Sequence, residues 1–112
     1  MDQIVELADR LGKAIADSPA AVRLRAARKA QVDQPELNKL LDDYRTQSDK
    51  IAKLQAEKKP IEVQDKHRLR DLNDKLVSSE TFKELTAAQM EYVDLMRRVN
   101  DALQKHLTDT ED

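Results

Sequence analysis

The chain has 112 residues, in which 20 Lys and Arg nearly balance 22 Asp and Glu and leave a formal charge of −2. Charged residues make up 38% of it and aromatic residues 3%, with one Gly, three Pro and no Cys or Trp. The near-neutral charge excludes a histone-like polybasic protein, and the lack of Cys excludes disulfides, cysteine-ligated zinc and thiolate-bound iron–sulfur clusters. The shortage of Gly and Pro excludes a many-stranded sheet, whose turns need those residues.

The first two predicted helices lie on either side of a Ser-Pro break. Apolar residues recur at steps of three and four and predict an amphipathic helix over about 2–16. Gly12 falls inside this pattern, where its cost of ~1 kcal/mol indicates either tolerated variation or close approach of a neighbouring helix. Ser18 is expected to cap a shorter helix over about 19–31, with Pro19 at its first position.

Two further helices are predicted in the charged middle of the chain. Asp33 as N-cap, with Glu36 three residues later, indicates a helix that ends near Lys58, ahead of Pro60. A fourth, polar helix is expected over about 63–77. Each has an apolar seam, made in the third helix by Leu37, Leu40, Tyr44, Gln47, Ile51 and Leu54, and in the fourth by Leu69, Leu72 and Leu76.

The last predicted helix, over about 80–107, carries the longest heptad pattern. At ~1.5 Å per residue it is about 40 Å long, which exceeds the width of a compact globule of this size. It therefore needs a long partner surface, and we expect the 33–58 helix to supply it. Residues 108–112 are expected to form a flexible acidic tail. The seam of the 80–107 helix comprises Phe82, Leu85, Gln89, Tyr92, Met96, Val99, Leu103 and His106, flanked by Ala88, Leu95 and Ala102.

These elements predict one all-α domain over residues 1–112. We expect an elongated bundle of about five helices, two of them long and heptad-patterned, completed by dimerisation because large apolar side chains are few. The start of the chain lacks the pattern of a secretory signal, and no stretch has the ~20 apolar residues of a membrane span. The expectation is a cytoplasmic protein without membrane insertion.

No catalytic or metal-binding motif is found. Glu62, Asp65 and His67 do not converge as ligands, because helical residues two apart point to different sides. His106 is better explained as a cation near the end of a helix. We therefore expect no enzyme activity, no metal and no cofactor.

The densest basic run is Arg23, Arg25, Arg28 and Lys29. This face could meet RNA phosphates, an acidic protein or only solvent; no aromatic residue lies among these cations to stack on bases. Gln47 and Gln89 occupy seam positions, where they either fix register as buried polar residues or contact water. Met90 and Met96 are interpreted as ordinary core or interface side chains.

Three segments resemble the YlbF/YmcA family of small helical bacterial proteins. They are Glu6–Pro19, with its Leu-Gly and Ser-Pro steps, Leu40–Gln55, and Ala88–Asn100, with its Ala-Gln, Leu-Met and Val-Asn steps. The resemblance implies paired long helices, dimers or higher assemblies, and no catalytic residues. It also implies an accessory regulator of competence, sporulation and biofilm formation, within a complex that influences RNA maturation and decay. Some members bind iron–sulfur clusters through cysteines, which this chain lacks.

The leading hypothesis is a helical adaptor that binds itself and partner proteins, including family paralogues and an RNA-processing complex. Large aromatic and aliphatic side chains dominate buried contact energy. The alternative is a direct RNA-binding protein that uses the 23–29 face. The predicted interface comprises Phe82, Leu85, Gln89, Tyr92, Leu95, Met96, Val99 and Leu103.

Overall fold

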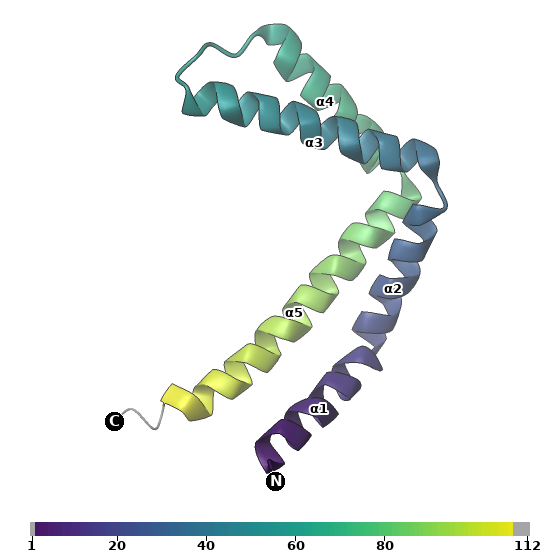
Figure 1. Cartoon of the computed structure of the whole chain (residues 1–112). Coiled ribbons are helices and arrows are strands. Elements are labelled where there is room, and N and C mark those ends of the chain that lie inside the picture. The colour runs from purple at the N-terminus through teal and green to yellow at the C-terminus, as the bar shows by residue number, and fades with distance from the viewer. Residues whose placement is uncertain (1, 109–112) are drawn as a thin grey trace. The chain divides into compact units, whose positions relative to one another are not determined.

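The computed structural model describes residues 2–108, and within them it contains five helices and no strand (Figure 1). The all-α class and the order of the elements are confirmed. Thr108 ends the last helix, and the other residues of the predicted tail lie outside the described residues. The helices are α1 (Gln3–Ala16), α2 (Pro19–Val32), α3 (Pro35–Ala56), α4 (Val63–Val77) and α5 (Glu80–Thr108).

Serine side chains cap α2 and α5 as their positions in the sequence predict. The Ser18 hydroxyl accepts a hydrogen bond from the Ala21 backbone N–H at 3.2 Å, and the Ser79 hydroxyl accepts one from the Phe82 N–H at 3.1 Å. Each bond satisfies an amide that has no partner inside its helix. These short polar side chains therefore set where the two helices begin.

The predicted cap of α3 is wrong by one residue. Gln34, not Asp33, is the N-cap, and no side chain caps this end. Pro35 is the reason: its ring favours extended backbone in the preceding residue, and Gln34 has φ −120° and ψ 89°. The first helical residue is therefore Pro35, which leaves Glu36 one position short of that needed for a capping box.

The other end of α3 turns through a left-handed residue. Lys58 has φ 57°, and the backbone N–H of Lys59 donates to the Leu54 carbonyl at 2.9 Å while that of Lys58 donates to the Gln55 carbonyl at 3.1 Å. This pair of bonds is the Schellman motif, in which glycine usually takes the left-handed position. The helix consequently ends at Ala56, two residues before the predicted Lys58.

The chain divides into two compact units, which we call the terminal unit (1–28 and 85–112) and the central unit (29–84). In the terminal unit α2 packs against α5, and Tyr92 lies against their shared core. No residue of α1, which also belongs to this unit, is buried in the described structure. The core side chains are Leu24, Ala27, Leu85 and Ala88.

In the central unit α3 packs against α4 (Figure 1). Leu37 of α3 and Leu72 and Leu76 of α4 are buried, as the two seams predict. A short connection brings α4 back along α3, and in the terminal unit α2 lies against α5; the expected pairing of the last helix with the 33–58 helix stays a prediction. The single domain over 1–112 and its completion by dimerisation stay predictions. Within residues 2–108 no helix is both long and apolar enough to cross a membrane.

Candidate protein-interaction surface

The predicted interface residues of α5 differ in how far their own chain covers them. Leu85 is buried in the core of the terminal unit, whereas Leu103 remains 49% exposed. Phe82 belongs to the central unit, where it is half-buried. The other seven predicted interface residues all belong to the terminal unit. Their role as an interface stays a prediction. Of the remaining residues, Gln89 is exposed, and Tyr92, Leu95, Met96 and Val99 are half-buried.

Two of these residues line a hollow where the three helices of the terminal unit meet. We call this hollow, of about 370 Å³, the terminal groove. Tyr92 and Met96 of α5 form one wall of it, and Arg25 and Arg28 add positive charge to an otherwise apolar lining. The groove therefore suits an apolar side chain on a segment that carries negative charge. Its other lining residues are Gly12, Ile15 and Ala16 of α1 and Ala21 and Leu24 of α2.

A second apolar strip on α5 is formed by Met90 and Val93, which are both largely exposed. It continues to Arg97 and borders a shallow hollow of about 430 Å³. Val93 was not among the predicted interface residues, because it lies outside the heptad seam. The spacing of Met90, Val93 and Arg97 by three and four residues is the signal in the sequence that could have identified this strip.

Arg97 of α5 pairs with two acids of its own helix. The Arg97 guanidinium donates to an Asp94 carboxylate oxygen at 2.6 Å and lies 3.7 Å from a carboxylate oxygen of Asp101. The hydrogen bond to Asp94 is the main cause that raises the pKa of Arg97, with a smaller contribution from Asp101. These charges offset one another beside the apolar strip of Met90 and Val93.

The predicted basic face of α2 is partly engaged within the chain. Arg23 forms an ion pair with Glu91 of α5 at 2.6 Å, and Arg25 donates to the backbone carbonyl of Ala16, the last residue of α1, at 2.8 Å. Arg28 lines the terminal groove, and Lys29 is exposed in the central unit. Two of the four cations thus connect helices, although all four remain exposed to solvent.

The two seam glutamines differ: one is a buried polar residue and the other is exposed to water. Gln47 is 5% exposed, and its Nε2 donates to the backbone carbonyl of Asp65 at 3.0 Å. Lys50 donates to the Asp65 carboxylate at 2.9 Å. That hydrogen bond is the largest cause of the lowered pKa of Asp65. Gln47 therefore connects α3 to the first turn of α4, whereas Gln89 is exposed.

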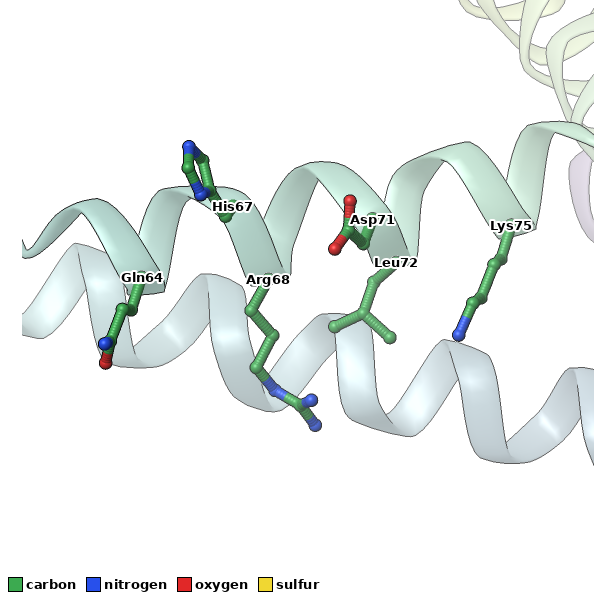
Figure 2. A pocket seen from close by; sticks show the side chains of 6 residues that line it. All are labelled: Gln64, His67, Arg68, Asp71, Leu72 and Lys75. Atoms are coloured by element: carbon green, nitrogen blue, oxygen red, sulfur yellow. The ribbon is translucent and has the colours of Figure 1, made fainter.

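A hollow of about 330 Å³ on α4 contains one of the two histidines. Figure 2 shows that its six lining residues come from this one helix, with His67 and Asp71 directed away from Gln64, Arg68 and Lys75. Charges of both signs lie along it without converging, so it lacks the arrangement of a binding site. In the described part of the chain, no three His, Cys, Asp or Glu side chains are placed to hold a metal ion.

Comparison with known proteins connects these features to a family. A family model described as "Control of competence regulator ComK, YlbF/YmcA" matches residues 4–108. The match begins at the second residue of α1 and runs to the last residue of α5. Searches of curated proteins and of solved structures gave no significant match. The resemblance seen in the sequence is confirmed: the chain belongs to the YlbF/YmcA family.

Proposed function

We propose that this protein is a non-enzymatic regulator of competence that acts as a helical adaptor, binding a second copy of itself and other proteins. The family description supports the regulatory role. The observation that carries the adaptor role is the apolar surface of the terminal unit, where α5 presents Tyr92, Met96 and Val99 half-buried and Leu103 exposed.

A surface of this composition is well suited to protein binding. Aromatic residues and Met are enriched where proteins meet, and a few of them dominate the binding energy. Tyr92 lies against the core of its own unit, which holds its ring in place before binding and lowers the entropy lost on association. The exposed Leu103 extends the same seam toward the end of α5.

The experiment that tests this function combines Tyr92→Ala with Met96→Ala. We expect the double variant to weaken self-association or capture of partner proteins by at least about tenfold, since each change removes a large apolar contact. Light scattering and pull-down with purified protein measure the two effects. Val32→Ala with Val63→Ala is the control, because both valines are exposed in the central unit.

Tyr92 also packs on the core, so its replacement could lower folding stability. Leu103→Gln avoids this difficulty because Leu103 is already 49% exposed. If both the double variant and Leu103→Gln keep the mass and the partner capture of the unsubstituted chain, this surface is not the interface and the proposal is wrong.

The proposed partners, from the family resemblance, are paralogues and a complex that modulates RNA processing. Direct RNA binding through the 23–29 face is the alternative. What favours a protein partner is that Arg23 and Arg25 already have partners in the chain, and that no aromatic residue lies among the four cations to stack on bases. Fluorescence anisotropy with single-stranded RNA separates the two: affinity that falls steeply with salt and is lost in Arg25→Glu with Arg28→Glu would establish the alternative.

A further inference from the structure

The charged side chains that line the terminal groove are both cations. Arg25 is held there, because its guanidinium donates to the Ala16 carbonyl at 2.8 Å. Arg28 lines the groove too and, within residues 2–108, forms no ion pair or side-chain hydrogen bond. No Asp or Glu of the described chain lines this hollow, whereas the hollow beside the apolar strip of α5 contains Asp94 beside Arg97. The groove therefore favours an occupant that brings negative charge.

The apolar surface extends beyond the terminal groove. Tyr92 and Met96 also line a hollow of about 480 Å³ that continues along α5, and this hollow shares Val93 and Arg97 with the one beside Met90. The three hollows thus adjoin on the surface of the terminal unit. A surface that follows several turns of α5 suits a segment of polypeptide better than a small molecule, which proteins usually bury in a single pocket.

This surface offers a partner side chains and not backbone. Within residues 2–108 every regular element is a helix, so the described chain has no sheet edge to which an extended peptide could add a strand. A segment that binds here must satisfy its own backbone N–H and C=O groups, which an α-helix does internally. Its apolar residues would recur at steps of three and four and enter adjoining hollows.

The most exposed apolar helix of the chain itself does not have this chemistry. Ile4 and Leu7 of α1 are largely exposed, but the helical spacing places Glu6 and Asp9 on the opposite side of α1. A copy of α1 would therefore bring apolar side chains to the groove without acids to face Arg28. A helix of another protein, with acids beside its apolar residues, fits better.

We propose that the terminal groove binds an acidic amphipathic helix of another protein, whose apolar side chains enter the groove beside Tyr92 while its adjacent Asp or Glu residues pair with Arg25 and Arg28. The inference rests on the proposed function and deepens it by naming the chemistry of the partner. Tyr92 packs on the core of its unit and Arg25 is held by Ala16. Both are thus in place before binding, which lowers the entropy lost on association.

The first test selects a phage-displayed library of helical peptides, randomised along one face, against the full chain. Retained peptides should carry large apolar residues at steps of three and four with Asp or Glu beside them, and Arg28→Glu should weaken their binding by at least about tenfold. Lys29→Glu is the matched control, because Lys29 is exposed and does not line the groove. Retained peptides without a preference for acids, or with equal affinity for Arg28→Glu, would overturn the proposal.

An exchange of charges tests the direct contact. A selected peptide resynthesised with Lys at its acidic positions should bind Arg28→Glu more tightly than it binds the unsubstituted chain, because opposite charges then face each other again. A role of Arg28 in folding alone would not be reversed by a change in the peptide. The absence of rescue would therefore contradict the contact.

The next test blocks the groove without weakening the fold. Gly12 lines the groove, and a Cβ added there would meet no heavy atom within 4 Å. Because glycine weakens the interior of a helix, Gly12→Leu should raise the urea midpoint of unfolding while its side chain, by taking up space in the groove, weakens the selected peptides by at least about tenfold. Ala14→Leu, at an exposed position of α1 outside the groove, is the control. Unchanged peptide affinity in Gly12→Leu would overturn the site.

Two other occupants give different results. Single-stranded RNA that binds more tightly than the selected peptides, with affinity lost in Arg28→Glu, would overturn the proposal in favour of phosphate recognition. Dissociation of a dimer by Gly12→Leu, measured by light scattering, would assign the groove to a second copy and overturn it as well. If the selection retains no peptide while Tyr92→Ala with Met96→Ala still abolishes self-association, the acidic helix is wrong and the proposed function stands.

Discussion

Lys58 holds the end of α3 in a conformation that glycine adopts more readily. Its φ of 57° brings Cβ close to backbone atoms, at a cost of about 1–2 kcal/mol for an L-residue. We predict that Lys58→Gly raises the free energy of unfolding by roughly 0.5–1 kcal/mol, since the added freedom of the unfolded chain offsets part of the gain. Urea denaturation measures it. Lys59→Gly is the control, because Lys59 is not left-handed; an equal gain there would refute the explanation.

Asp65 gives the central unit a defined dependence on acid. The hydrogen bond from Lys50 lowers its pKa below the ordinary value of 3.8. A lowered folded-state pKa adds stability that is complete above the unfolded value and is lost as the pH falls through the folded one. Asp65→Asn should therefore destabilise the chain at neutral pH, and its difference from the unsubstituted protein should narrow below about pH 4. Urea unfolding across the pH range tests this against Asp49→Asn, at an exposed acid of α3.

Single residues show where inference from the sequence stops. Gln47 and Gln89 occupy equivalent seam positions, yet one is buried and bonded to Asp65 while the other is exposed. The heptad pattern identifies both as facing inward, but it does not contain the position of the neighbouring helix. Likewise, the engagement of Arg25 by the Ala16 carbonyl depends on the turn between α1 and α2, which a list of cations cannot reveal.

At the scale of elements, the core between α2 and α5 holds the terminal unit together. Leu85 is buried with Leu24 and Ala27, so Leu85→Ala leaves a cavity. We predict a loss of about 2–4 kcal/mol of folding stability, measured by chemical denaturation. Met90→Ala, at an exposed position of the same helix, should cost less than about 0.5 kcal/mol when the chain is monomeric. Equal losses would mean that this core does not stabilise the unit.

The helices themselves were largely predictable. Serines before α2 and α5, apolar periodicity and the prolines locate all five within a few residues. Pairing between helices was not: the length of the last helix indicates that it needs a partner but does not say which. The start of α3 was shifted by Pro35, whose restriction on Gln34 overrides the capping pattern of Asp33 and Glu36.

At the scale of the whole molecule, the family is established by a match over residues 4–108, and the sequence alone pointed to it. The sequence also predicted Tyr92 and Met96 as interface residues and Arg25 and Arg28 as part of a basic face. The fold brings these four side chains to the terminal groove. Members of two predicted sets that are separate along the chain thus meet at one site. The exposure of the apolar face of α1 was not predicted, because the same periodicity marks a buried helix and an uncovered one equally.

The central claim is that this protein works through assembly on the apolar surface of its terminal unit. Size exclusion coupled to light scattering, across a series of protein concentrations, tests it most directly. We predict twice the mass of one chain at high concentration, falling toward the mass of one chain on dilution, as a reversible dimer requires. A fully helical protein that keeps the mass of a single chain at every concentration would contradict self-assembly.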